Sequence, residues 1–268
     1  CEDFGLAREI AARPLVYDEH TLCLAKKYDA EVFVKINTGM NRLGFSTIGE
    51  TASAVKNLRV LGVFTHLSSA DGDDATDRRI TEAQIKNFME AELVVKNEKD
   101  VPFYAENSAA LIKYGRFFDG ARIGIALYGV NPVPGDKTPL LPVMTFRAAV
   151  IAINTVKKGD FIGYSRGYRA KKDMRVAIIS TGYADGLPRA LSNKGMIFCN
   201  GQFLKIVGKV SMDSVAVDAG DADVKIMDEV VVFGDKIKVT DVANRADTLP
   251  YEILTGVSER VKRVYKNP

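Results

Sequence analysis

Two positive charges follow a single apolar run in the stretch VFVKINTGMNRLGF, residues 32–45. Lys35 comes at the end of the run, and Arg42 follows after an asparagine and a Thr-Gly turn. Two unmodified cations at one strand end repel each other. A buried strand that delivers both charges to its C-terminal end therefore indicates a functional site at that end.

Polar residues also follow two later apolar runs. His66 comes directly after one of them, in FTHLSSAD, and the chain has only one other histidine, His20. A lone histidine is more often structural than catalytic. Asn107 and Ser108, in AENSAA, could open a helix and offer amides and a hydroxyl to an anion, although an ordinary helix N-cap explains them equally well.

Three more clusters combine glycine with residues that could do chemistry. In ARIGIALYG, Arg122 puts a cation beside Gly124 and Ile125, where the missing Cβ lets the backbone approach a ligand closely. A satisfied ion pair is the alternative for this arginine. Tyr183 lies in the turn GYADG, which by itself is typical of a hairpin. The last cluster closes the stretch VGKVSMD and consists of Met212 and Asp213.

Short apolar strands and longer helical patterns alternate in the first half of the chain. A helical pattern at 75–97 lies among four expected strands, at 31–36, 59–66, 103–107 and 121–125. The run at 31–36 is almost continuously apolar, as in strands covered on both faces. Each strand ends in polar residues, and the strand ends of a parallel α/β barrel share the face that carries the active site. We therefore expect a partial α/β barrel of the TIM type over residues 1–138.

The character of the sequence changes after NPVPGDKTPLLP. Turn dipeptides separate β-rich runs at 143–156, 175–181, 196–199, 205–212 and 229–234. A short helix is expected at 239–246, and an amphipathic segment at 250–265 closes the chain. These patterns predict a second, mainly β domain over residues 139–268.

Composition excludes several classes of function. The 268 residues include 37 basic and 34 acidic ones, mixed along the chain, which argues against nucleic acid as a partner. The three cysteines are scattered, which favours a reducing, cytoplasmic location and no structural metal. No run of about 18 apolar residues occurs, so we expect no membrane contact by this segment.

Taken together, the six clusters resemble the alanine racemase family. Its signatures are matched in order by VKINTGMNRLGF, FTHLSSAD, NSAA, ARIGIALYG, GYADGLPR and GKVSMD, spread over both expected domains. The resemblance implies an α/β barrel that binds pyridoxal 5′-phosphate, followed by a β domain. It also implies interconversion of L- and D-alanine by two bases, with D-alanine supplied for peptidoglycan, in a homodimer with shared active sites.

The resemblance assigns a role to each candidate residue. Tyr183 would be one base, His66 would hydrogen-bond it, and Arg122 would contact the cofactor's ring nitrogen. Arg42 would reach the cofactor's phenolic oxygen and the substrate, held by a carbamate on Lys35. The residues near the cofactor's phosphate would be Asn107, Ser108, Gly124 and Ile125. The residues on the substrate side would be Lys35, Tyr183, Met212 and Asp213, the last three reached from the partner subunit.

Two departures from the family pattern, and a milder third one at Tyr104, leave alternatives open. Nothing here matches the family's VKANAYGHG motif, whose lysine binds the cofactor covalently, and we expect that part of the barrel to precede Cys1. Glu259 stands before Arg260, where many members have a tyrosine, and Tyr104 stands where histidine is common. A glutamate in place of that tyrosine leaves room for a larger substrate. A serine racemase of the same fold, sometimes tethered to a membrane domain, and a non-catalytic cofactor-binding remnant are therefore the alternatives.

Overall fold

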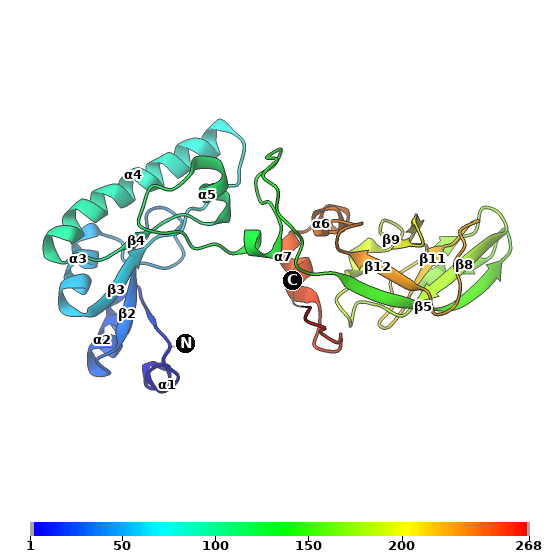
Figure 1. The fold of residues 1–268 in the computed structure, drawn as a ribbon, viewed down its shortest axis with the longest axis horizontal. Coiled ribbons are helices and arrows are strands. Elements are labelled where there is room, and N and C mark those ends of the chain that lie inside the picture. The colour runs from blue at the N-terminus through cyan, green and yellow to red at the C-terminus, as the bar shows by residue number, and fades with distance from the viewer. Residues whose placement is uncertain (1–2, 267–268) are drawn as a thin grey trace. The chain divides into compact units, whose positions relative to one another are not determined.

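A computed structural model describes residues 3–266 of the chain. The chain divides into two compact units (Figure 1). The first comprises Cys1–Leu127 with Asn131–Leu140, and the second comprises Tyr128–Val130 with Leu141–Pro268.

The first unit is built on a parallel four-stranded sheet in the order β1-β2-β3-β4 (Figure 1). Its strands are β1 (Leu15–Val16), β2 (Glu31–Lys35), β3 (Arg59–Phe64) and β4 (Phe103–Tyr104). Its helices are α1 (Phe4–Glu9), α2 (Glu19–Lys27), α3 (Ile48–Asn57), α4 (Ala75–Glu98) and α5 (Ser108–Tyr114). The expected alternation of strand and helix is present, and it begins earlier than expected because β1 and α2 precede β2.

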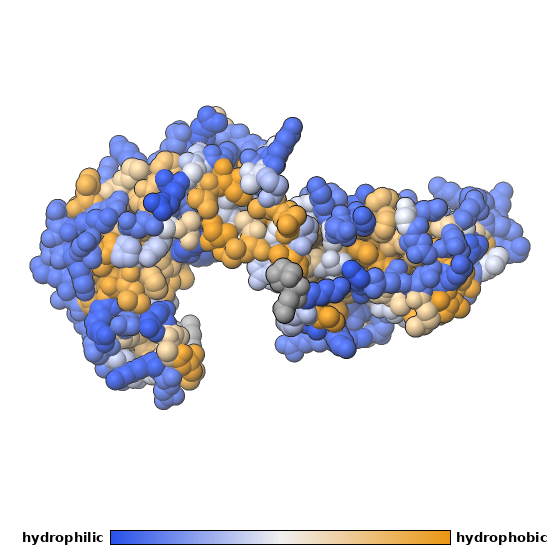
Figure 2. All heavy atoms as spheres, in the orientation of Figure 1, coloured by the Kyte–Doolittle hydropathy of each residue, from blue (hydrophilic) through white to orange (hydrophobic). Residues whose placement is uncertain are grey.

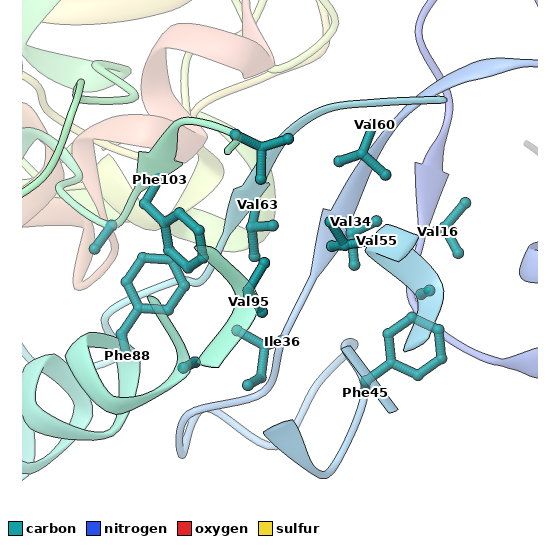
Figure 3. Packing of buried hydrophobic residues seen from close by; sticks show 14 of the residues in the cluster. Val16, Val34, Ile36, Phe45, Val55, Val60, Val63, Phe88, Val95 and Phe103 are labelled. Atoms are coloured by element: carbon teal, nitrogen blue, oxygen red, sulfur yellow. The ribbon is translucent and has the colours of Figure 1, made fainter. Parts of the chain in front are cut away.

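Helices α3 and α4 begin at side chains that satisfy their first amides. Thr47 and Glu50 form a capping box at α3, and Asp74 accepts a hydrogen bond from the amide of Asp77 at α4. The buried side chains of α4 recur at helical spacing and are Thr81, Gln84, Ile85, Phe88, Ala91 and Val95. Figure 3 shows Phe88 packed against Phe103 of β4, with ring centroids 5.1 Å apart. This stripe fixes α4 against the sheet.

The two faces of the sheet are covered unequally. Val32 and Val34 are fully buried, whereas Phe33, between them, is half-buried. On that second face the rings of Phe33 and Tyr104 lie 6.2 Å apart, centroid to centroid. A Cβ on Gly62 would come within 2.6 Å of the Tyr104 ring, so glycine is required for the ring to fit there. The apolar run at 31–36 thus predicted more cover on the second face than this unit provides.

The expected strand at 121–125 is wrong. The chain makes one parallel bridge to β4, between Tyr104 and Gly120, and then turns into a 3₁₀ segment, η1 (Ile125–Tyr128). The hydroxyl of Ser108 accepts hydrogen bonds from the amides of Gly124 and Ala126. Since a side chain takes these two amides, they are not available to a neighbouring strand.

The second unit contains an antiparallel six-stranded sheet in the order β10-β9-β12-β5-β8-β11 (Figure 1). Its strands are β5 (Phe146–Val156), β8 (Met174–Ile179), β9 (Met196–Cys199), β10 (Gln202–Lys205), β11 (Val215–Asp218) and β12 (Glu229–Phe233). A separate pair is formed by β6 (Phe161–Ile162) and β7 (Tyr168–Arg169). The helical segments are η2 (Tyr164–Arg166), η3 (Arg189–Leu191), α6 (Val239–Ala246) and α7 (Pro250–Gly256).

The expected strand at 205–212 is also wrong beyond its first two residues: Lys205 ends β10, and Ile206 makes one isolated antiparallel bridge to Val217 of β11. The amide of Gly208 donates to the Asn193 side chain at 2.7 Å, and the amide of Val210 donates to the Ser192 hydroxyl at 3.0 Å. Side chains therefore hold residues 208–210 in place of a strand partner. The carbonyls of Ser211 and Met212 face the GYADG turn instead.

Candidate active site

The C-terminal ends of three parallel strands meet in register. Lys35 of β2 is the register partner of Phe64 of β3, and Phe64 is the partner of Tyr104 of β4. The Lys35 side chain is buried, and its ammonium lies 5.9 Å from the centre of the Phe64 ring. Burial lowers the pKa of Lys35, and the charges of Arg42 and Arg122 lower it further. The expected placement of Lys35 at a strand end is what the structure shows.

Arg122 and His66 form a direct contact beside this lysine. Arg122 Nη2 lies 2.7 Å from His66 Nδ1 and also donates to the carbonyl of Thr65 at 2.7 Å. The guanidinium carbon lies 4.3 Å from the centre of the Phe64 ring. A guanidinium can only donate, so Nδ1 must accept, and the imidazole is neutral with its proton on Nε2.

The surroundings keep His66 neutral. Burial lowers its pKa to about 4, with further contributions from the charges of Arg122, Arg42 and Lys35. Burial also lowers the pKa of Arg122, and the charge of Arg42 lowers it further. Within the described residues, Nε of Arg122 is a buried nitrogen without a hydrogen-bond partner. One donor of this guanidinium is thus left for another group.

Arg42 is exposed and follows a loop that Asn37 shapes. The Asn37 side-chain oxygen accepts hydrogen bonds from the amides of Gly39 and Asn41, at 3.1 and 2.9 Å. Asn37 Nδ2 donates back to the Asn41 side chain at 3.0 Å. This Asn-centred turn carries the chain from the end of β2 to Arg42, whose charge acts on Lys35, His66 and Arg122 alike.

Asn107 and Ser108 begin α5, as expected. Asn107 is the N-cap and accepts a hydrogen bond from the Ala110 amide at 2.9 Å, while its Nδ2 donates to the Leu67 carbonyl at 3.1 Å. Ser108 is buried, and its hydroxyl joins α5 to the amides of Gly124 and Ala126, at 3.0 and 3.3 Å. Gly124 and Ile125 therefore lie next to Ser108.

The second unit holds Tyr183 and Met212 close together. The Tyr183 amide donates to the Ser211 carbonyl and the Ala184 amide to the Met212 carbonyl, both at 3.0 Å. A Cβ on Gly182 would lie 2.2 Å from the Met212 carbonyl oxygen, so only glycine allows this approach. The side chains themselves point outward, with Tyr183 44% and Met212 53% exposed.

Arg260 links the same turn to the end of α7. Its Nη2 lies 2.7 Å from an oxygen of Asp213, and its Nε lies 3.5 Å from an oxygen of Asp185. The Ser258 amide donates to the Asp185 carbonyl at 3.2 Å. Glu259, the residue before Arg260, is exposed. The candidate residues thus fall into two groups, one in each unit.

Sequence reasoning missed two buried polar groups behind the first cluster. Gln84 of α4 is 2% exposed and Glu106, just after β4, is fully buried. Gln84 lies on the apolar stripe of α4, which is the signal that could have singled it out. Glu106 accepts hydrogen bonds from the amides of Phe117 and Phe118, while its other oxygen is buried without a partner in the described part of the chain.

Two classes of site are not found within residues 3–266. No group of three or more histidine, cysteine, aspartate or glutamate side chains there could hold a metal ion. None of the helices described is long and apolar enough to span a bilayer. What the first unit offers instead is a patch of Lys35, Arg42 and Arg122 around a neutral imidazole, suited to an anionic ligand at parallel strand ends.

This fold and site define an α/β-barrel enzyme segment followed by a β domain, and comparisons with known proteins agree. Residues 1–132 match the alanine racemase N-terminal domain, and residues 143–265 match the C-terminal domain. An alanine racemase of Halothermothrix orenii is 36% identical over an alignment of 261 positions that covers 91% of this chain and 68% of that protein. One of Aquifex aeolicus is 33% identical over 264 residues, which are 98% of this chain and 74% of that protein.

Solved structures similar to this chain are also alanine racemases. Alanine racemase from Acinetobacter baumannii is 33% identical, with a TM-score of 0.85, over 97% of this chain and 75% of that one. The Bartonella henselae enzyme, solved with covalently bound pyridoxal phosphate, is 29% identical, with a TM-score of 0.86, over 98% of this chain and 75% of that one. The chain belongs to the alanine racemase family, and the expected fold class is confirmed.

Proposed function

We propose that this protein interconverts L- and D-alanine with pyridoxal 5′-phosphate as its cofactor. The observation that carries the proposal is the contact between Arg122 and His66 beside the buried Lys35, at the strand ends of a chain that belongs to this family. Serine as the preferred substrate finds no support in the relatives, which are alanine racemases. The family membership likewise favours an enzyme over a non-catalytic remnant.

The residues of the first unit fit this cofactor. Its phosphate is an anion that would replace the Ser108 oxygen as acceptor for the amides of Gly124 and Ala126, while the Ser108 hydroxyl would turn and donate to it. The free Nε of Arg122 suits a pyridine nitrogen that stays unprotonated, because an arginine gives up no proton to it. When bound, the cofactor withdraws electrons from the substrate's α-carbon and so acidifies its C–H bond.

His66 would prepare a tyrosine to act as a base. Because Nδ1 faces Arg122, the imidazole presents an N–H at Nε2, which can donate to a phenolic oxygen. A tyrosine with an ordinary pKa near 10 is a weak base at neutral pH, and a donor together with nearby positive charge stabilises its anion. We assign that phenol to Tyr183, which would take or return the α-proton on one face of the substrate.

Lys35 would carry a carbamate. Only the neutral amine reacts with carbon dioxide, and burial together with the charges of Arg42 and Arg122 lowers the pKa of Lys35 in that direction. The product is an anion, which replaces repulsion by attraction toward the two arginines. Arg42 would then be held in place to contact the cofactor's phenolic oxygen and the substrate.

A second copy of the chain would complete each site. Tyr183 and Met212 are exposed on the second unit and are fixed through their backbones, so their side chains can enter the site of a partner. Large apolar side chains are also exposed elsewhere on this unit, among them Leu249 at 65% and Tyr251 at 51%. Figure 2 shows hydrophobic patches among polar ones on the visible face. A homodimer would cover such side chains, and Asp213 would lie on the substrate side with Met212.

The test is a racemisation assay of the purified protein. The proposal expects conversion of L-alanine to D-alanine, dependent on added pyridoxal 5′-phosphate, at a higher rate than for L-serine. It also expects an Arg122→Met variant to be at least about a hundredfold slower. Absence of turnover in a protein that binds the cofactor would overturn it. The same reaction would supply D-alanine for the cell wall in the cytoplasm.

A further inference from the structure

We propose that Gln84 is a positioning residue of the active site, which holds the segment after β3 so that His66 meets Arg122. This role rests on the proposed function. Gln84 lies on the buried face of α4 and is 2% exposed, yet its amide makes four hydrogen bonds to segments far from it in the sequence.

The amide of Gln84 binds the chain on both sides of Leu67, at His66 and at Ser68. Nε2 donates to the His66 carbonyl at 3.1 Å. Oε1 accepts from the Ser68 amide at 2.9 Å and from the Ser68 hydroxyl at 3.0 Å. The intervening carbonyl, of Leu67, accepts from Asn107 at 3.1 Å. Residues 66–68 are therefore held to α4 and α5 by two side-chain amides.

Gln84 also ties this segment to the loop after β2. Its Nε2 donates to the Thr38 hydroxyl at 3.4 Å, and that hydroxyl lies 2.7 Å from the hydroxyl of Thr65. The Thr65 hydroxyl donates to the Ile36 carbonyl at 3.0 Å. The ends of β2 and β3, which carry Lys35 and His66, are thus joined through one buried polar network.

This network sets the geometry of the Arg122 contact. Arg122 Nη2 reaches both the Thr65 carbonyl and His66 Nδ1, so the two acceptors must stay at a fixed separation. The bond from Gln84 to the His66 carbonyl fixes the backbone from which the ring extends. Without it, the ring is free to leave Arg122 and turn toward water.

The decisive experiment compares Gln84→Met with Thr81→Val in the full-length protein. Methionine keeps the length and volume of the side chain but makes none of the four hydrogen bonds. Thr81 is a matched control: it lies one turn away on α4, is fully buried, and has a hydroxyl without a partner among the described residues, so valine replaces it without losing a contact.

The readout is the titration of His66 followed by NMR, with its signal assigned from a His66→Asn variant. The charges near the imidazole are those of Arg122, Arg42 and Lys35. We expect the midpoint to rise by roughly one pH unit or more in Gln84→Met, because the ring gains water and leaves Arg122, and to stay unchanged in Thr81→Val. An unchanged midpoint in folded Gln84→Met overturns the proposal.

Two further measurements keep the test decisive. If Gln84→Met does not fold, Gln84→Asn, which keeps the amide one methylene short, must shift the His66 midpoint in the same direction, and a midpoint equal to wild type overturns the proposal. In an active enzyme, Gln84→Met should lower kcat by about tenfold with little change in KM. The titration needs no turnover, so a failure of the proposed activity is separable from a failure of this role.

Discussion

Nδ1 of His66 accepts a hydrogen bond from the guanidinium of Arg122 at 2.7 Å, which fixes both the charge and the tautomer of the imidazole. A protonated ring would have to point an N–H at an arginine. Burial lowers the pKa of His66 from an ordinary value of 6.5 to about 4, and the charges of Arg122, Arg42 and Lys35 contribute further. The protein is expected to bind a proton at His66 only when this contact opens.

This contact should make stability depend on pH. The unfolded chain binds a proton at His66 near pH 6.5, whereas the folded chain resists it until about pH 4. The contribution of His66 is therefore fully present above pH 6.5 and is lost as the pH falls toward 4. Urea unfolding of wild type and His66→Asn across this window measures it. Equal slopes of unfolding free energy against pH in both proteins would contradict the prediction.

Lys35 should form a carbamate in the folded protein. In ¹³C-labelled bicarbonate at slightly alkaline pH, we expect a carbamate NMR signal that disappears in Lys35→Gln. The exposed Lys158, which lies outside the cluster, offers a control, since Lys158→Gln should leave the signal unchanged. A signal that survives in Lys35→Gln, or never forms, rules the carbamate out at this position.

Sites shared between two subunits should show complementation. Arg122→Met and Tyr183→Phe alter different units, and each alone should be nearly inactive. Mixing them after reversible dissociation should restore about a quarter of wild-type activity, because half of the dimers are mixed and half of their sites carry neither change. A mixture as inactive as its parents would mean that each site is made within one chain.

Glu106 should stabilise the turn that leads to Arg122. Its carboxylate accepts the amides of Phe117 and Phe118, and its own carbonyl accepts the Arg122 amide at 2.7 Å. Glu106→Ala leaves two amides unpaired and should lower the free energy of unfolding by about 1–3 kcal/mol. Glu106→Gln keeps one acceptor oxygen and should cost less than about 1 kcal/mol. Urea denaturation compares the two, and an equal loss in both would refute the assignment.

Gly182 should tolerate no side chain. An added Cβ would meet the Met212 carbonyl oxygen at 2.2 Å, so Gly182→Ala should push the two turns apart and destabilise the protein by about 1–3 kcal/mol. Gly256→Ala is the matched control in the same unit, since a Cβ there meets nothing within 4 Å. Thermal melting of the two variants checks this, and similar melting temperatures would show that the approach is looser than described.

Helix starts, strand ends and the alternation of elements could be predicted from residues close together in the sequence. Asn107 was expected to open a helix because an asparagine side chain can accept a hydrogen bond from the amide three residues later. Lys35 was expected at a strand end because an apolar run stops there. The alternation of strands and helices likewise needs only short windows of sequence. These features therefore appear in the structure where the patterns placed them.

What the sequence did not reveal depends on contacts between distant segments. Residues 121–125 form no strand because Ser108, 16 residues before Gly124, takes its amide. The role of Gln84 on α4 depends on its hydrogen bonds to His66 and Ser68, which are far from it in the sequence. The bond between Arg260 and Asp213 joins residues 47 positions apart. No periodicity or spacing rule relates such pairs.

The register of Lys35 with Phe64 also limits how this protein can change over evolution. Side chains alternate between the two faces of a strand, so deleting or inserting one residue within β2 would turn the lysine toward the helices and bring a valine or isoleucine to the strand end. A change in length is therefore better tolerated in the connections than within β2. Within β2 only substitutions are open to selection, and at Lys35 they would remove the amine that lies beside Arg42 and Arg122.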